Sequence, residues 1–283
     1  MIHGVLLLLA LLAAACASPA RVTFTNATPE RPREIAADTY VPDGGGSFPA
    51  VVLLHGCEGV SETTRRWARW LRGRGYLALV VDSWGPRGLA HTCAFTVPDP
   101  PATERLDDAL GALRHLHARA DVDRARIAVM GWSNGGVFAL AAVNAPSLER
   151  AAARGVALPA PGFRAAVAIY PGGCESLIGQ RLARPTLILA AAADDWTPAA
   201  PCVELGTAMR AAGEDVRVEV FAGAYHYFDV EGLARTELSE VGNDNRPGGC
   251  CGATVAYDAA AARAARARVA EFLGYHLGPL KNQ

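Results

Sequence analysis

The chain has 283 residues, of which 51% are hydrophobic, and its 27 basic side chains are balanced by 28 acidic ones. This length and hydrophobic content suffice for one domain with a single core. The balanced charge gives no electrostatic basis for binding nucleic acid or an anionic membrane surface, and no internal apolar run is long enough to span a bilayer.

The N-terminus has the pattern of an export signal. The apolar stretch Val5–Ala15 has the length of a signal-peptide hydrophobic region and is followed by Cys16. The run Leu12–Cys16 resembles a bacterial lipobox, in which the cysteine becomes the lipid anchor, although Ala13 stands where leucine is usual. Ordinary cleavage near Ala15 is the alternative. We expect residues 1–16 to be the signal and residues 17–283 one domain that is periplasmic, anchored at the membrane or secreted.

Short apolar runs predict the strands. Two segments near the start, Val22–Asn26 and Glu34–Val41, are expected to pair antiparallel at a sheet edge. Six later runs, mostly near-continuous in Val, Ile, Leu and Ala, are typical of strands buried on both faces of a parallel sheet. These runs are Ala50–Leu54, Leu77–Val81, Ile127–Met130, Ala166–Tyr170, Thr186–Ala190 and Val216–Phe221.

Helical patterns lie between and after these runs. Thr64–Arg72 and Glu104–Ala118 repeat large apolar residues at helical spacing, and Tyr257–Tyr275 has a buried stripe of Val269, Phe272 and Leu273. The alternation of strand and helix predicts an α/β fold with a mostly parallel, doubly wound sheet flanked by helices. Sites in such sheets lie at the carboxyl ends of the strands.

The segment Gly131–Gly135 reads G-W-S-N-G and lies between a predicted strand and a predicted helix. A strand followed by G-x-S-x-G and then by a helix is the nucleophile-elbow pattern of α/β-hydrolases. The serine occupies a tight turn, and glycines two positions to either side avoid a steric clash. The pattern predicts Ser133 as a nucleophile. The alternative is a glycine-rich turn whose serine caps the helix.

A serine nucleophile needs a base and an orienting acid, which follow it in this fold in the order acid, then histidine. Asp194 and Asp195 come just after a predicted strand. We favour Asp194, which is closer to the strand, whereas Asp195 fits a charge at a helix N-terminus. His226 follows the last predicted strand and is the expected base. Asp229 is expected to cap the local turn.

The oxyanion that forms during acyl transfer needs two N–H donors. One is expected from Asn134, directly after the nucleophile, and the other from Cys57 in the loop after the strand Ala50–Leu54. His55 in that loop is expected to support the turn. This chemistry requires no metal and no organic cofactor.

Six cysteines follow Cys16, and an even number in an exported protein indicates disulfides. The residues before each cysteine place two pairs at the same sheet edge, so we predict the bonds Cys57–Cys93 and Cys174–Cys202. The remaining pair, Cys250 and Cys251, lies in a segment, residues 242–252, that is typical of a surface insertion. No C-x-x-C pairs are present, which argues against structural zinc.

Five motifs together resemble the dienelactone hydrolase family over residues 35–275; they are residues 55–60, 82–88, 131–136, 194–198 and 225–229. The resemblance implies an α/β-hydrolase fold without a large cap domain and hydrolysis of esters or lactones. Ser133 stands where dienelactone hydrolases proper have cysteine, which points to the family's serine-bearing members. By resemblance, Arg87 binds a substrate carboxylate; fixing the loop Gly85–Gly88 is its alternative role. Trp132 is the second candidate for substrate contact.

The sequence therefore predicts an exported serine hydrolase that acts on a small carboxylic ester or lactone, with a monomer favoured. Ser133 would attack the carbonyl, His226 would move the proton, and Asp194 would hold the imidazole. An acyltransferase or a peptidase could use the same triad, because loops determine the pocket. A non-catalytic envelope protein that keeps the fold for binding is the alternative from another class.

Overall fold

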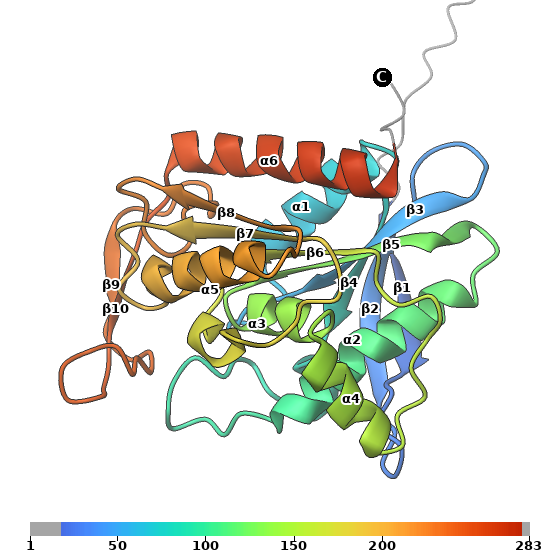
Figure 1. The fold of residues 1–283 in the computed structure, drawn as a ribbon, viewed down its shortest axis with the longest axis horizontal. Coiled ribbons are helices and arrows are strands. Elements are labelled where there is room, and N and C mark those ends of the chain that lie inside the picture. The colour runs from blue at the N-terminus through green and yellow to red at the C-terminus, as the bar shows by residue number, and fades with distance from the viewer. Residues whose placement is uncertain (1–17, 279–283) are drawn as a thin grey trace, which may run out of the picture.

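The computed structural model describes residues 18–278 (Figure 1). The predicted signal and the lipid anchor at Cys16 lie outside the described residues. Among the residues described, no helix is both long and apolar enough to cross a membrane.

An eight-stranded sheet forms the centre of the molecule, in the order β1-β2-β4-β3-β5-β6-β7-β8. β1 and β2 pair antiparallel, as predicted, and β2 also runs antiparallel to β4. All other pairs in this sheet are parallel. The strands are β1 (Ala20–Thr25), β2 (Glu34–Tyr40), β3 (Phe48–Leu54), β4 (Leu77–Asp82), β5 (Val122–Trp132), β6 (Ala165–Ile169), β7 (Thr186–Ala191) and β8 (Val216–Phe221).

Helices cover both faces of this sheet (Figure 1). One face packs against α1 (Glu62–Arg72) and α6 (Ala259–Leu277). The other side carries α2 (Ala102–His117), α3 (Asn134–Ala141), α4 (Ala145–Ala153) and α5 (Ala199–Ala211). Two short 3-10 helices, η1 (Gly85–Arg87) and η2 (Cys174–Leu177), follow β4 and β6. The predicted doubly wound α/β architecture is confirmed.

Two apolar layers hold the helices onto the sheet. The predicted stripe of α6, with Val269, Phe272 and Leu273, is buried against the sheet together with Trp67 of α1. The helix begins at Asp258, whose carboxylate accepts the N–H groups of residues 260 and 261. Such a side-chain acceptor satisfies N–H groups that have no partner within the helix.

The two predicted disulfides are both present. Cys57–Cys93 joins the loops that follow β3 and β4, and Cys174–Cys202 joins η2 to α5. Cys250 and Cys251 are bonded to each other in a largely exposed loop between β9 (Thr236–Leu238) and β10 (Ala253–Val255). The segments joined by the first two disulfides all follow the carboxyl ends of the parallel strands of the main sheet.

Candidate active site

Ser133 lies on a strained turn between β5 and α3. Its backbone has φ of 49° and ψ of −118°, a conformation that non-glycine residues rarely adopt. A Cβ atom at Gly131 would overlap the carbonyl oxygen of Gly135, and one at Gly135 would overlap that of Leu54. The two glycines of the motif are therefore required sterically by this turn.

Asp194 and His226 form a buried pair at the ends of β7 and β8. The carboxylate Oδ2 of Asp194 lies 2.7 Å from the imidazole Nδ1 of His226, and both side chains are fully buried. Asp194 also accepts the backbone N–H groups of Trp196 and Thr197 at 2.9 and 2.8 Å. Burial raises the pKa of Asp194, but His226 and these donors outweigh it and hold that pKa below its usual range.

Thr197 also contacts this pair, a role that the sequence analysis missed. Its hydroxyl lies 3.0 Å from Nδ1 of His226 and 2.9 Å from Oδ2 of Asp194. The same hydroxyl lies 3.0 Å from the carbonyl oxygen of Tyr170. These contacts attach the acid and the imidazole to the end of β6.

The other ring nitrogen of His226 is left open. With Nδ1–H donated to Asp194, Nε2 carries a lone pair, and this buried atom has no hydrogen-bond partner among residues 18–278. A buried nitrogen without a partner is costly in a purely structural role. A neutral imidazole held in this tautomer can accept a proton from a hydroxyl.

Ser133, Cys57 and Asn134 line a single cavity of about 390 Å³. Asn134 is the first residue of α3, and Cys57 follows β3, so the two residues expected to form the oxyanion hole lie on the same cavity as the serine. Trp196 and Thr197, next to the acid, line this cavity as well. The Cys57–Cys93 bond is part of its wall.

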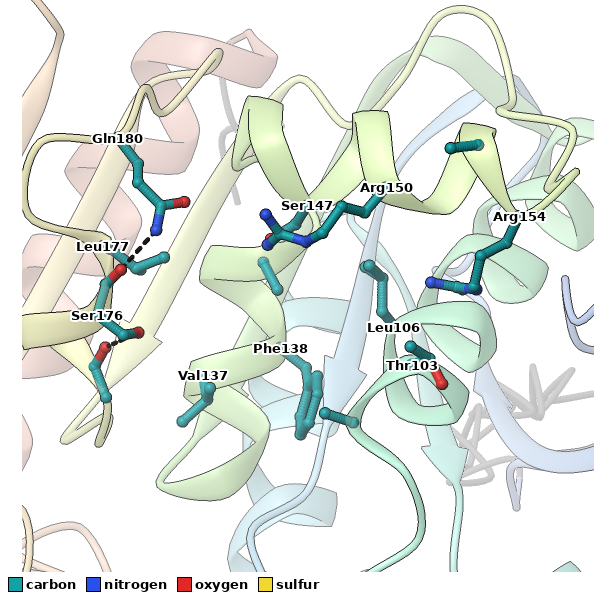
Figure 2. A pocket seen from close by; sticks show the side chains of 14 residues that line it. Thr103, Leu106, Val137, Phe138, Ser147, Arg150, Arg154, Ser176, Leu177 and Gln180 are labelled. Atoms are coloured by element: carbon teal, nitrogen blue, oxygen red, sulfur yellow. Dashed lines mark hydrogen bonds between the residues drawn. The ribbon is translucent and has the colours of Figure 1, made fainter.

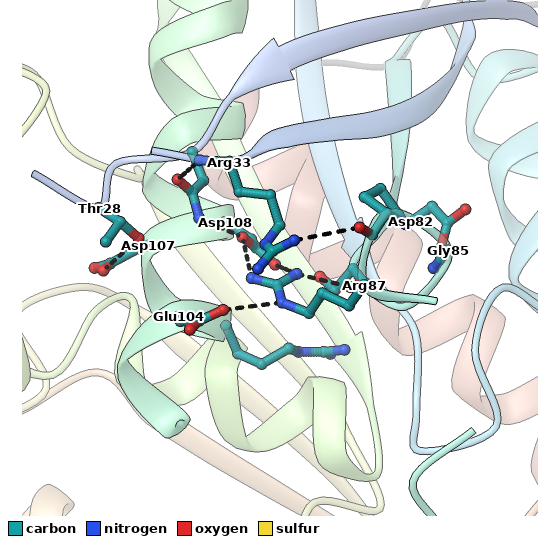
Figure 3. Close-up of polar contacts among 12 residues, drawn as sticks. Thr28, Arg33, Asp82, Gly85, Arg87, Glu104, Asp107 and Asp108 are labelled. Atoms are coloured by element: carbon teal, nitrogen blue, oxygen red, sulfur yellow. Dashed lines mark hydrogen bonds and ion pairs between the residues drawn. The ribbon is translucent and has the colours of Figure 1, made fainter. Parts of the chain in front are cut away.

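Arg87 is engaged away from this cavity (Figure 3). Its guanidinium donates two hydrogen bonds to the carboxylate of Asp108, at 2.8 and 3.0 Å, and one to Glu104 at 3.0 Å. A further bond to the carbonyl of Ser83, at 2.6 Å, ties it to the loop before η1. The side chain is 5% exposed. Arg87 therefore has the second of the two roles expected for it, fixing the loop Gly85–Gly88, and it is not among the residues that line the cavity at Ser133.

Trp132 lies beneath the turn rather than in the cavity. It is 2% exposed, and its indole N–H donates to Asp229 at 2.9 Å. Asp229 accepts two further bonds, from the indole of Trp67 at 2.8 Å and the hydroxyl of Tyr170 at 2.7 Å. The prediction that Asp229 caps the local turn was wrong, because its carboxylate connects aromatic donors that come from α1, β5 and the end of β6.

Asp195, the alternative acid, points elsewhere. Its carboxylate accepts the N–H and the hydroxyl of Thr254 at 2.8 and 2.9 Å and pairs with Arg246 at 3.1 Å. These contacts attach the inserted loop between β9 and β10 to the body of the protein. Of the two aspartates, only Asp194 lies against His226 among the described contacts.

His55 supports its turn as predicted. Its Nε2 accepts the N–H of Ser83 at 3.1 Å, so Nδ1–H faces the carbonyl of Gly56 at 2.7 Å. Burial, reinforced by the nearby Arg105, lowers the pKa of His55 well below its usual value and keeps the ring neutral. The loop that carries Cys57 is thereby fixed to the loop after β4.

The family model of the dienelactone hydrolase family matches residues 35–277. The chain belongs to the dienelactone hydrolase family. The match agrees with the fold, with the order of the motifs and with the range, residues 35–275, over which the sequence resembles this family.

Two curated relatives are similar in sequence. One, from Bradyrhizobium sp., is named "Probable 2-oxo-3-(5-oxofuran-2-ylidene)propanoate lactonase"; it is 27% identical over 37% of this chain and 44% of its own length. The other, from Methylorubrum extorquens, is named "Putative carboxymethylenebutenolidase"; it is 26% identical over 70% of this chain and 69% of its own length. The chain thus spans less than half the length of the first relative and about two thirds of the second.

A solved structure has the same fold. Thermogutta terrifontis esterase 2 phosphorylated by paraoxon aligns with a TM-score of 0.63 and 20% identity, over 94% of this chain and 98% of that chain. At this identity the likeness establishes the α/β-hydrolase architecture.

Proposed function

We propose that the protein hydrolyses small carboxylic esters or lactones through an acyl-enzyme formed on Ser133. The observation that carries this proposal is the buried Asp194–His226 pair, whose Nε2 has no partner among the described residues and whose neighbour Thr197 lines the same cavity as Ser133. This is the combination of acid, base and nucleophile that serine acyl transfer needs.

In the first step, Oγ of Ser133 attacks the ester carbonyl carbon while Nε2 of His226 takes the hydroxyl proton. The negative charge that develops on the carbonyl oxygen is accepted by the N–H groups of Cys57 and Asn134. The tetrahedral species collapses, and His226 returns the proton to the departing alkoxide, so that an alcohol leaves and the acyl group remains on the serine.

In the second step, a water molecule gives a proton to His226 and attacks the acyl carbon. Collapse releases the carboxylic acid and restores the serine hydroxyl. For a lactone, the alcohol and the acid remain parts of one product. Asp194 keeps Nδ1–H in place throughout and stabilises the imidazolium that forms in each step.

We propose uncharged esters rather than carboxylate-bearing dienelactones as the preferred substrates. Among residues 18–278, no arginine or lysine lines the cavity at Ser133, and Asp99 is the charged residue of that lining. Arg87 is occupied by Asp108 and Glu104. A substrate carboxylate would therefore enter this cavity without a cation to pair with it.

We also propose that the protein is exported. Three disulfides are formed among the described residues, and such bonds persist in oxidising compartments. The signal sequence and the acylation of Cys16 remain predictions from the sequence.

Turnover of p-nitrophenyl acetate by the purified protein and by Ser133→Ala tests the proposed function. Hydrolysis that is lost in the variant, with circular dichroism unchanged, supports it. Equal turnover by both proteins would overturn the role of Ser133. Product transfer to an added alcohol, or cleavage of a peptide in preference to the ester, would favour an acyltransferase or a peptidase instead.

A further inference from the structure

Figure 2 shows a second cavity, of about 620 Å³, which shares the lining residue Val137 with the smaller cavity at Ser133. Its larger apolar side chains are Leu106 of α2, Val137 and Phe138 of α3, and Leu177 of η2, and alanines of α2, α3 and α4 complete the apolar lining. Cavities of this size hold organic ligands of intermediate size. The proposed reaction at Ser133 does not by itself need this space.

The two cavities meet at Val137. This half-buried side chain lines both of them. The N–H of Val137 donates to the carbonyl of Ser133 at 3.1 Å, so the two residues are one helical turn apart. Ser133, Val137 and Ala141 are spaced four residues apart and share one face of α3. These three residues therefore form a row along α3 that runs from the nucleophile to the lining of the larger cavity.

The polar groups of the larger cavity lie on its rim. Figure 2 shows Arg150 and Arg154 reaching from α4 over the cavity. Arg154 pairs with Asp107 at 2.6 Å, and Arg150 donates to the hydroxyl of Ser147 at 3.1 Å. Within the part of the chain that the structure describes, no carboxylate lines this cavity. The apolar side chains of this lining can cover the methylenes of an aliphatic group, and removing those methylenes from water is favourable.

We propose that this cavity binds the aliphatic acyl chain of a medium-length ester, which makes Val137 and Ala141 determinants of chain-length specificity. The inference rests on the proposed function. The acyl group, unlike the alcohol, stays bonded to Ser133 through both steps. A cavity reached along the helix that begins at Ser133 is placed to hold that group while water enters from the smaller cavity.

The experiment measures kcat/KM for p-nitrophenyl acetate, butyrate, hexanoate, octanoate and decanoate. Because the leaving group is constant, differences report the acyl site. We expect kcat/KM to rise with each added methylene until the cavity is filled, by at most about fourfold per methylene. A value that falls steadily beyond butyrate would overturn the proposal.

Substitutions on α4 provide a matched pair. Ala153 lines the cavity, whereas the neighbouring Ala152 is exposed and lies outside the lining. We expect Ala153→Phe, and the deeper Ala141→Phe, to lower the ratio of octanoate to acetate kcat/KM by at least about tenfold, since each fills space that several methylenes would occupy. Ala152→Phe should leave that ratio unchanged. Equal ratios in all three variants would overturn the proposal.

A series of alkyl acetates with increasing alcohol length separates the two ends of the substrate. If the rate rises with alcohol length and Ala153→Phe removes that rise, the cavity binds the leaving group and the proposal is wrong. Acetate turnover that persists in Ser133→Ala would overturn the proposed function and this inference with it. Ser133-dependent acetate turnover with a flat acyl profile would overturn this inference alone.

Discussion

The indole N–H of Trp132 donates to Oδ2 of Asp229 across 2.9 Å, and this bond joins the residue before the nucleophile to the loop that carries His226. Trp67 and Tyr170 donate to the same carboxylate at 2.8 and 2.7 Å. The buried carboxylate of Asp229 thus connects β5, α1 and the end of β6 to the loop that carries His226. We infer that it sets the position of His226 relative to Ser133.

Asp229→Asn should therefore lower kcat and stability without removing activity. The amide retains one oxygen acceptor, and its NH₂ group then faces a donor, which leaves a buried polar group unpaired at a cost of about 1–3 kcal/mol. Urea unfolding and kcat on a short ester check both effects. Glu231→Gln, an exposed change two residues later, is the control. An Asp229→Asn enzyme with wild-type kcat would show that the network does not position the base.

The two adjacent aspartates are expected to differ sharply in their effect on turnover. Asp194→Asn removes the carboxylate that holds the His226 tautomer, so kcat should fall by about 10³- to 10⁴-fold. Asp195→Asn affects only the contacts with Thr254 and Arg246 and should cost far less activity. Steady-state kinetics of both variants at pH 8 provide the comparison. Similar losses in the two would refute the assignment of Asp194 as the orienting acid.

The lowered pKa of His55 makes the stability of the folded protein depend on pH. Its pKa is well below its usual value of 6.5 in the folded protein, so the unfolded chain binds one more proton between those two values. The stability contribution is present above about pH 6.5 and is lost as pH falls towards the folded pKa, by about 1.4 kcal/mol per pH unit.

His55→Gln should remove this part of the pH dependence. Urea unfolding at pH 5, 6 and 7 measures the slope of the unfolding free energy against pH. His91→Gln, at an exposed loop position, is the control and should leave the slope as it is in the wild type. An unchanged slope in His55→Gln would contradict a buried neutral imidazole at this position.

The Cys57–Cys93 bond is expected to support activity as well as stability. It joins the loop that carries Cys57, the proposed oxyanion donor, to the segment 92–99, most of which lines the cavity, and the N–H of Thr92 also donates to the carbonyl of Cys57 at 2.8 Å. Replacing both cysteines by serine should lower Tm and reduce kcat/KM, since the cavity wall loses its cross-link. Loss of such a bond typically costs about 2–4 kcal/mol of stability.

The paired replacement Cys250→Ser and Cys251→Ser is the control, because that bond lies in a largely exposed loop away from the cavity lining. It should change neither kcat/KM nor Tm appreciably. Wild-type kcat/KM in the Cys57→Ser, Cys93→Ser protein would show that the cross-link has no part in shaping the site.

Much of the fold could be predicted from local patterns. Strands buried on both faces read as continuous apolar runs, so each predicted run falls within or largely overlaps a strand of the sheet, whereas the order of the strands was not predicted. β5 begins five residues earlier than the apolar run, because residues 123–126 are polar and partly exposed. Helices α4 and α5 were not predicted; the alanine-rich α5 gives little contrast between its faces, and α4 is only nine residues long.

The parts of the site that require a local sequence motif could be predicted. The parts that depend on partners far away in the sequence could not. Glycines flank Ser133 because the elbow leaves no room for a Cβ atom. The partners of Asp229 include Trp67, which lies 162 positions earlier in the chain, and no local pattern predicts that contact. The two roles left open for Arg87 could not be separated for the same reason, since its carboxylate partner Asp108 lies on α2, 21 positions later.

Labelling with a fluorophosphonate probe tests the central claim most directly, since such a probe reacts with a serine that a neighbouring base activates. The account predicts that peptide mass mapping finds the probe on Ser133, that Ser133→Ala is not labelled, and that Asp194→Asn is labelled much more slowly. Folded wild-type protein that is not labelled, or that carries the probe on another residue, would contradict it.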